Sequence, residues 1–146
     1  MKKKVAFETT LEVRDACLCL HAQRAARALA RRFDEALRPF GLTNGQFSLL
    51  MALNRPEPVS LTPLSRFLAM DRTTLTAALK PLQRDGLVQG CANPQDGRSR
   101  LLRLTALGEA KLATAVPIWR STHQTIEAEL LPHNADALRA GLAALC

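Results

Sequence analysis

Between residues 60 and 105 the sequence predicts two short helices joined by a tight turn, and no other feature restricts the fold as strongly. Thr62 and Pro63 are typical of a helix start, with threonine as the N-cap and proline in the first helical position. Asp71 can cap a second helix from Arg72 to about Asp85, and the glycine that follows ends it. Two short helices connected in this way form a helix-turn-helix.

A β-hairpin is expected directly after the second helix. Residues 87–91 favour a strand, and residues 99–104 favour a returning strand in which leucines alternate with polar side chains. Asp96 and Gly97, in the loop between them, are a hairpin turn signal. The expected fold is therefore mainly α with a small β-hairpin wing, which is a winged helix-turn-helix.

The segment before this region has the composition of one long helix from Leu11 to about Arg38. It contains neither glycine nor proline, and Pro39 and Gly41 stop it. Such a helix would be a rod of roughly 45 Å, which is long for so small a domain. Since a rod of this length needs more apolar partner surface than one small body offers, we expect it to pack against a second copy of the chain.

Further capping signals place the remaining helices. Thr43 and Gln46 have the spacing of a capping box, and the apolar residues 47–53 follow as a short helix. Thr105 can cap a long helix that runs to about residue 131. Pro132 is then expected to start a last helix with three leucines on one face.

The charge of the chain favours a polyanionic partner. Its 20 lysines and arginines face 13 aspartates and glutamates, which gives a formal net charge of +7. Between Arg66 and Arg103 seven basic residues face three acidic ones, whereas from Leu104 onward three basic residues face four acidic ones. The excess positive charge therefore coincides with the helix-turn-helix and the hairpin.

Other classes of protein find little support in the sequence. No apolar run approaches the roughly 20 residues that a membrane-spanning helix needs, and Glu8 and Glu12 lie where the apolar stretch of a secretory signal would be. We therefore expect a cytoplasmic protein without a membrane partner. The four cysteines form no zinc-finger or CxxC pattern, and we expect no bound metal and no cofactor.

The helix from Arg72 to Asp85 has two different faces. At 100° per residue, Leu75, Leu79 and Leu82 gather on one face, which must pack on the body. The opposite face is small, hydroxylated and basic, which suits close approach to DNA and contact with phosphates or base edges. It carries Thr73, Thr76, Ala77, Lys80 and Arg84, with Arg72 at its N-terminal flank. Taken alone, this face could also belong to a solvated surface helix.

The hairpin presents further basic side chains. Arg98, next to the turn, can project from the tip, and a narrow minor groove attracts an inserted arginine. Asp96 is placed to orient that guanidinium through a charge-assisted hydrogen bond. Arg100 and Arg103 can meet phosphates from the returning strand. The alternative is an exposed turn whose Asp–Arg pair contributes little stability.

These segments carry a resemblance to a known family. Residues 96–105, DGRSRLLRLT, resemble the DxRxxxLxLT wing signature of the MarR family of bacterial regulators. Residues 71–76, DRTTLT, and the shorter segments 41–43 and 107–108 are also similar to that family. The resemblance runs from about residue 11 to the C-terminus, and the wing motif with the helix before it is its specific part.

The resemblance implies a winged-helix homodimer that binds pseudo-palindromic operators in double-stranded DNA, commonly as a repressor relieved by a small-molecule effector or an oxidant. One domain would cover residues 1–146, with a DNA-binding lobe at about 43–105 and dimerisation helices at about 8–40 and 106–146. By motif match, Asp96 orients the wing. The expected DNA-binding residues are Arg72, Thr73, Thr74, Thr76, Lys80, Arg98 and Arg100.

Cys17, Cys19 and His21 are candidate sensor residues. The two cysteines would lie about 200° apart around a helix, which disfavours a bridge between them. Cys17 and His21 share a face and could form a thiolate-activating or metal-binding pair. Cys17 is also similar in position to the reactive cysteine of the family's organic-hydroperoxide sensors, which hold the sulfur with tyrosines that this chain lacks. Packing at an interface, redox sensing and metal binding all remain open.

Two other functions compete with DNA recognition. A winged helix can serve as a protein-interaction module, although Arg72, Lys80 and the threonines between them argue against it. A thiol-dependent enzyme, such as a peroxidase, has no supporting motif. The sequence therefore predicts a sequence-specific DNA-binding transcriptional regulator and no enzyme.

Overall fold

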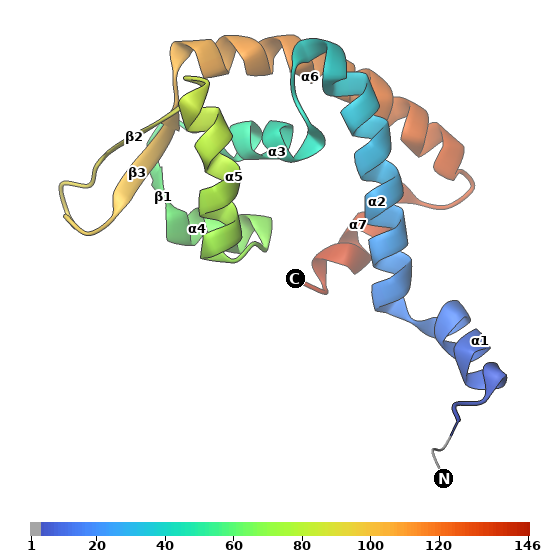
Figure 1. Cartoon of the computed structure of the whole chain (residues 1–146). Coiled ribbons are helices and arrows are strands. Elements are labelled where there is room, and N and C mark those ends of the chain that lie inside the picture. Colours follow the sequence, from blue (N-terminus) through green and yellow to red (C-terminus); the bar gives the residue numbers. More distant parts are fainter. Residues whose placement is uncertain (1–3) are drawn as a thin grey trace.

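The computed structural model describes residues 4–146, so Met1, Lys2 and Lys3 of the lysine-rich N-terminus lie outside the described residues. Helices dominate the chain, and three short strands lie in its middle (Figure 1). The elements are α1 (Phe7–Ala16), α2 (Leu18–Leu37), the 3-10 turn η1 (Arg38–Phe40), α3 (Asn44–Leu53), β1 (Val59–Ser60), α4 (Leu61–Leu68), α5 (Arg72–Arg84), β2 (Val88–Ala92), β3 (Arg100–Leu104), α6 (Ala106–Leu130) and α7 (Ala135–Ala143).

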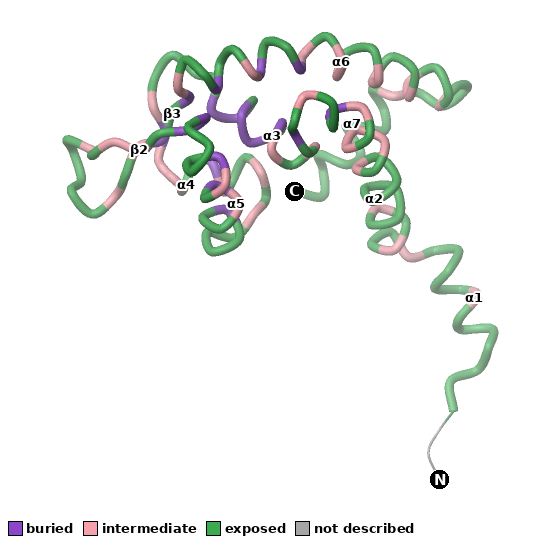
Figure 2. Tube along the Cα trace, turned by 45° about the horizontal axis from the view of Figure 1, so that its top comes forward, coloured by how far each residue is buried: buried purple, intermediate pink, exposed green. Residues whose placement is uncertain are grey.

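The buried side chains gather in one lobe, made by α3, α4, α5 and the three strands and covered by the first half of α6. Leu50, Leu64, Leu75 and Val88 are almost completely buried there. Figure 2 shows that α1, α2 and α7 are exposed or half-buried along almost their whole length. The predicted winged helix-turn-helix is confirmed, and its outer helices extend away from the lobe.

β3 is the central strand of an antiparallel sheet with the order β1-β3-β2. Val88 of β2 pairs with Leu104, and Val59 of β1 pairs with Leu102. All four side chains are buried, so one face of the sheet packs on the lobe. The sequence predicts the hairpin of β2 and β3 but not β1, because a strand of two residues offers no alternation to detect.

The single helix expected from Leu11 to Arg38 is wrong, because the chain forms two helices that meet at Cys17. Cys17 has an extended backbone (φ −71°, ψ 108°) and is both the C-cap of α1 and the N-cap of α2. Its Sγ accepts the backbone N–H of Leu20 at 3.4 Å, which satisfies one of the amides that a helix start leaves unpaired. No residue of α1 is buried, so packing on the described chain does not hold α1 in line with α2.

Side-chain caps set three other helix starts where the sequence places them. Thr43 and Gln46 form the expected capping box at α3. Asp71 caps α5, and Thr105 caps α6 by accepting the N–H of Gly108 at 3.0 Å. Each cap supplies an acceptor for an amide of the first turn, which explains why these boundaries could be located from residue types alone.

Two helix starts differ from the expectation. α4 begins one residue before Thr62, which therefore lies inside the first turn and is not the N-cap. α7 begins at Ala135 and not at Pro132, because the Asn134 side chain accepts the N–H of Ala137 at 3.0 Å and caps the helix. α4 follows β1 directly and α7 starts after the Asn134 cap, so in neither place does the proline occupy the first helical position.

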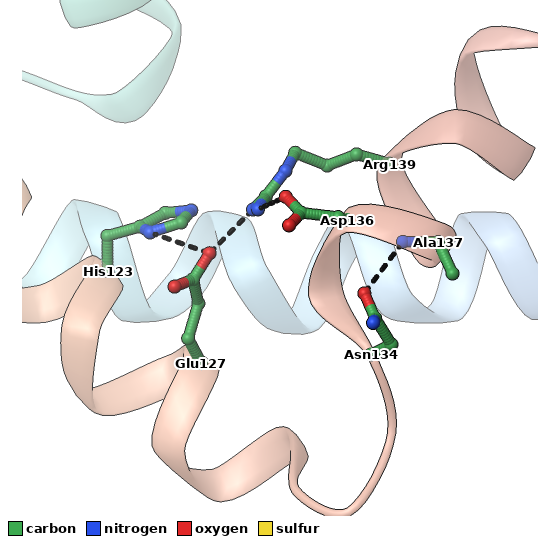
Figure 3. A network of polar contacts seen from close by, with 6 residues as sticks. All are labelled: His123, Glu127, Asn134, Asp136, Ala137 and Arg139. Carbon is green, nitrogen blue, oxygen red and sulfur yellow. Dashed lines mark hydrogen bonds and ion pairs between the residues drawn. The ribbon is translucent and has the colours of Figure 1, made fainter.

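Charged side chains orient α7 against α6 (Figure 3). Arg139 of α7 donates to Glu127 of α6 at 2.6 Å and to Asp136 of its own helix at 2.5 Å. The Nδ1 atom of His123 lies 3.6 Å from the same Glu127 oxygen. Because these groups are well exposed to solvent, the cluster fixes the angle of α7 more than it stabilises the fold.

The start of α6 makes a close backbone contact with the lobe. A Cβ atom added to Gly108 would lie 2.1 Å from the carbonyl oxygen of Leu87, far inside van der Waals contact. The Thr105 hydroxyl donates to the Gly86 carbonyl, and the Thr105 N–H donates to the Leu87 carbonyl. Glycine at position 108 therefore allows the first turn of α6 to lie directly on the start of β2.

Replacement of Gly108 by alanine should destabilise the fold, since the Leu87 carbonyl cannot move without losing its hydrogen bond. We expect the free energy of unfolding to fall by about 1–3 kcal/mol, the range for overpacked interior positions, as measured by urea denaturation. Gly141→Ala in α7 is the matched control, because nothing lies within 4 Å of a Cβ there. Wild-type stability of the Gly108→Ala variant would contradict the close contact.

Candidate nucleic-acid interface

The exposed face of α5 carries the side chains that the sequence assigns to DNA contact. Leu75, Leu79 and Leu82 are 0%, 2% and 1% exposed, so they fix the rotation of the helix about its axis. The predicted two-faced helix is thereby confirmed. The opposite face is open to solvent and displays Arg72, Thr73, Thr74, Thr76 and Lys80.

The side chain of Thr74 belongs to the cap of α5. Asp71 accepts the Thr74 hydroxyl at 2.6 Å with one carboxylate oxygen and the Thr74 backbone N–H at 2.8 Å with the other. These two hydrogen bonds, the hydroxyl's first, hold the pKa of the Asp71 carboxyl below its ordinary value. The Thr74 hydroxyl is thus already in use, and its first task is to position the start of the helix.

The remaining threonines also differ from each other. The Thr76 hydroxyl donates to the backbone carbonyl of Arg72 at 2.7 Å, one turn earlier. The Thr73 hydroxyl has no hydrogen-bond partner among the described residues, and the charged groups of Arg72 and Lys80 have no carboxylate within 4.0 Å there. These three side chains are therefore the ones on this face whose donors are available to a ligand.

The wing loop is organised by side chains that bind its backbone. Asp96 accepts the backbone N–H of Arg98 at 3.0 Å, and Asn93 accepts that of Gln95 at 3.0 Å. The Asn93 amide also donates to the Ser99 hydroxyl at 2.9 Å, which ties the two ends of the loop together. Asn93 was not among the residues predicted for the wing, although asparagine at the start of a chain reversal is a signal for this kind of turn.

The predicted contact between Asp96 and the Arg98 guanidinium is wrong. The carboxylate bonds the Arg98 backbone instead, because an aspartate reaches the amide two residues ahead more readily than a long side chain folds back to it. Asp96 still orders the wing tip, through the main chain. Arg98 is exposed, its guanidinium has no partner within residues 4–146, and the hairpin that carries it extends beyond the lobe beside α5 (Figure 1).

The two arginines of β3 have different surroundings. Arg100 lies against Gly90 of β2, where an added Cβ would be 3.0 Å from the Arg100 Nε atom. The Arg103 guanidinium lies beside Gln89, whose amide oxygen, turned toward it, accepts from Nε and Nη2 at 2.6 and 2.7 Å. Arg100 is therefore the more available of the two for an external anion.

Cys17, Cys19 and His21 lie at the start of α2, away from α5 and the wing (Figure 1). The Nδ1 atom of His21 is 2.8 Å from the backbone carbonyl oxygen of Cys17, so the imidazole contacts the main chain and not the thiol. The Cys19 Sγ accepts from Gln23 at 3.4 Å. All four cysteines are unbridged, and no group of three potential metal ligands gathers anywhere in residues 4–146.

An apolar cavity of about 700 Å³ lies between α3, α4 and α6. Its lining includes Phe47, Met51, Phe67, Leu68, Val116 and Trp119. Phe67, one of these lining residues, is 69% exposed. The cavity is lined by α4, the helix directly before α5, so an occupant would touch α4 and α6 at once. As a separate point, no helix in the described chain is both long and apolar enough to cross a bilayer.

The chain is similar to known transcriptional regulators. The sequence model of the MarR family matches residues 42–99, which include α3, α4 and α5. The crystal structure of the M. tuberculosis transcriptional regulator MOSR in complex with DNA is 39% identical, with a TM-score of 0.80 over 88% of this chain and 92% of that chain. The transcriptional repressor CouR, bound to a 23-mer DNA duplex, is 29% identical, with a TM-score of 0.79 over 98% of this chain and 99% of that chain.

A curated relative shows how far the similarity reaches in sequence. The HTH-type transcriptional regulator BilQ of Clostridioides difficile is 30% identical over 96 residues, which are 66% of this chain and 65% of BilQ. The match thus spans slightly less than two thirds of that relative's length. The structural similarity to MOSR and CouR extends over nearly the whole chain and includes the helices outside the lobe.

Thr73→Ala and Thr74→Ala should separate an available hydroxyl from a capping one. Thr73→Ala should lower the affinity for a preferred duplex about three- to tenfold, the effect of one hydrogen bond, and should leave the Tm unchanged. Thr74→Ala removes the donor to Asp71, so its Tm should fall. Fluorescence anisotropy and thermal unfolding measure the two quantities. A Thr73→Ala variant that unfolds earlier but binds normally would reverse these assignments.

Proposed function

The chain belongs to the MarR family of transcriptional regulators, and on this premise we propose that it is a homodimeric, non-catalytic repressor that binds a pseudo-palindromic operator and is released by a small molecule or an oxidant. The dimer would form through the helices at about residues 8–40 and 106–146 and would present two DNA-binding lobes, at about residues 43–105. A regulator of bacterial type acts where the chromosome lies, so its place of action would be the cytoplasm.

The observation that carries the proposal is the open basic and hydroxylated face of α5 beside an open arginine at the wing tip. Arg72, Thr73 and Lys80 have donors available for phosphates and base edges. Arg98 would enter the adjacent minor groove. In a two-fold dimer the two α5 helices would occupy successive major grooves, about 10 base pairs apart.

Exposed leucines on the outer helices support the homodimer. Leu29 of α2 is 40% exposed, and Leu138 and Leu142 of α7 are 49% and 46% exposed. A second copy that covers these side chains would remove their apolar surface from water. Repression would then follow where the operator overlaps a promoter, and CouR, a repressor by its description, resembles this chain over almost its whole length.

The apolar cavity supports release by a small molecule. A ligand with an aromatic or aliphatic body would contact Phe47 and Trp119, and Arg55 and Arg120 in the same lining would favour an acidic group on it. Because the cavity walls belong to α3, α4 and α6, such a ligand would change how the lobe sits on α6. That displacement would move α5 out of register with its half-site.

The joint between α1 and α2 supports release by an oxidant. Cys17 is half-buried, and its sulfur accepts the backbone N–H of Leu20 in the first turn of α2. A hydroperoxide that converts this thiol to a sulfenic acid, and is itself reduced to the alcohol, would place an extra oxygen at the cap. The start of α2 would have to rearrange, and with it the helices that form the dimer.

Arg98→Ala should weaken operator binding about 5- to 100-fold without unfolding the protein, since one groove contact is worth roughly 1–3 kcal/mol. The operator is first found by sequencing the genomic fragments that the purified protein enriches, and affinity is then measured by mobility shift. The slope of log affinity against log salt should also fall by about 1. Arg38→Ala, outside the lobe, removes the same charge and should bind like the wild type.

The same selection decides between the proposed function and its alternative. If no sequence is enriched over competitor DNA, the chain is not a sequence-specific regulator, and a protein-interaction module becomes the better assignment. If sequences are enriched and Arg98→Ala binds them with wild-type affinity, the wing takes no part in recognition.

Cys17→Ser should keep the protein on its operator in the presence of an organic hydroperoxide, because the serine cannot be oxidised to a sulfenic acid. The wild type should be released under the same conditions, as followed by mobility shift. Cys146→Ser is the matched control, since Cys146 is also a free thiol but lies at the exposed C-terminus. Equal release of Cys17→Ser and the wild type would exclude Cys17 as the sensor.

A further inference from the structure

Two connections join the lobe to the outer helices. α6 is one helix of 25 residues, whose first half covers the lobe and whose remainder lies with α2 and α7 (Figure 1). The other connection is the short segment between α2 and α3, which consists of η1 and residues 41–43. The angle between the lobe and the outer helices is therefore set along α6 and at the junction of α2 with α3.

Asp34 of α2 reaches across this junction. One of its carboxylate oxygens accepts the backbone N–H of Asn44 at 2.7 Å and the side-chain amide of Asn44 at 2.9 Å. Asn44 is the first residue of α3, so its N–H is one of the donors that a helix start leaves unpaired. These two hydrogen bonds, the backbone one first, hold the pKa of Asp34 below its ordinary value. The bonded form is therefore the charged carboxylate.

The hydrogen bonds of Asp34 have a direction that the neighbouring apolar contact lacks. Leu37, one turn later, is 0% exposed, but burial of an apolar side chain has no preferred direction. In the described part of the chain, α2 makes side-chain hydrogen bonds to other helices at two places, from Asp34 to α3 and from Arg32 to Glu129 of α6. Two residues are about 200° around a helix, so α3 and α6 hold α2 from different sides.

The start of α3 has a complete cap without Asp34. Thr43 accepts the Gln46 N–H at 3.2 Å, and the Gln46 side chain accepts the Thr43 N–H at 3.1 Å. Residues within three positions of one another therefore specify where α3 begins. The carboxylate of Asp34 comes from ten residues earlier and from another helix. What it adds is a fixed position of α3 relative to α2.

We propose that Asp34 is a positioning residue that holds the lobe at one angle to the outer helices and thereby selects the half-site spacing of the operator. This inference rests on the proposed function and narrows the class of DNA that the dimer accepts. A two-fold dimer contains two such contacts, one in each protomer. Asp34 itself touches no DNA and acts through the orientation of α5.

The geometry of DNA makes spacing a sensitive measure of this contact. One extra base pair moves the second half-site by about 3.4 Å and turns it by about 35° around the duplex axis. A lobe that is held at Asp34 can follow this displacement only by breaking the two hydrogen bonds to Asn44. A lobe without this contact can follow it at a smaller cost in free energy.

Operators of altered spacing test the assignment. The operator found by genomic enrichment is rebuilt with one or two base pairs added or removed between its half-sites, and affinities are measured by fluorescence anisotropy. In Asp34→Ala the preference for the native spacing over the spacing one base pair longer should shrink about tenfold, the effect of one hydrogen bond to a charged group. The affinity for a duplex with a single half-site should stay at the wild-type value.

Matched variants separate this effect from general damage. Glu35→Ala removes the same charge from the next position, where the side chain is exposed, and should keep the wild-type preference. Gln46→Ala removes a hydrogen bond at the same helix start that does not involve α2, so the Tm should fall while the spacing preference stays. Asp34→Asn should keep most of the preference, because its amide oxygen can accept both hydrogen bonds from Asn44.

Asn44→Ala tests the other side of the contact. It keeps the backbone N–H and loses the 2.9 Å hydrogen bond, so the spacing preference should shrink less than in Asp34→Ala. Added to Asp34→Ala it should change nothing further, since both substitutions act on one contact. If Asp34→Ala does not fold, this milder variant carries the test.

An affinity that falls equally at every spacing in the Asp34 and Asn44 variants would overturn the assignment, because Asp34 would then stabilise the fold without positioning the lobe. Loss of the spacing preference in Gln46→Ala would overturn it too, since any damage to the start of α3 would then have the same effect. Failure of the proposed function gives a different result, in which the wild type enriches no operator at all, and both proposals are then wrong.

Discussion

Burial of one leucine face of α5 is the constraint on which the rest of the structure depends. Leu75, Leu79 and Leu82 repeat at intervals of four and three residues, and their burial leaves the helix only one rotation. A rotation by one residue would bring a lysine or a threonine into the core without a partner, and an unpaired buried polar group is strongly unfavourable. The residues on the opposite side of α5 are therefore held at the surface of the protein. The wing follows from the same constraint, because β2 begins four residues after α5 ends and the hairpin is built beside that helix.

Where the sequence predicts the fold correctly, a short-range interaction decides the structure. The capping box of Thr43 and Gln46 and the cap at Asp71 each involve groups within three residues of one another, so residue types are enough. The break at Cys17 is different. A thiol is a weak acceptor, and the residues on both sides favour a helix. No local sequence signal therefore predicts that the helix ends at this position. β1 was not predicted for a related reason, since its two residues form a strand only because β3 lies alongside them.

The candidate interface shows the same division. Periodicity places Arg72, Thr73 and Lys80 on the outer face of α5, because one helix has one geometry. Periodicity does not reveal which hydroxyls already make hydrogen bonds within the helix. The Thr76 hydroxyl donates to a backbone carbonyl one turn earlier, and the Thr74 hydroxyl donates to the carboxylate of the N-cap. Serine, threonine and aspartate side chains have several backbone partners within reach, and the rotamer that wins depends on the surrounding chain. The wing tip is one more case of that competition, because the Asp96 carboxylate accepts the backbone N–H of Arg98 and not its guanidinium.

A row of aromatic rings connects the lobe to the outer helices, and it would link the proposed effector to DNA binding. Trp119 of α6 stacks on Phe47 of α3 with ring centroids 6.2 Å apart and on His123 at 4.9 Å. His123 in turn lies 6.5 Å from Phe33 of α2. Trp119 and Phe47 also line the apolar cavity, so an occupant would contact two rings that lie between α3 and α6. In a dimer that reads two half-sites, the separation of the two α5 helices must match the helical repeat of DNA. In the proposed dimer a small rotation about α6 would change that separation, while each side chain proposed to contact DNA would keep its own conformation.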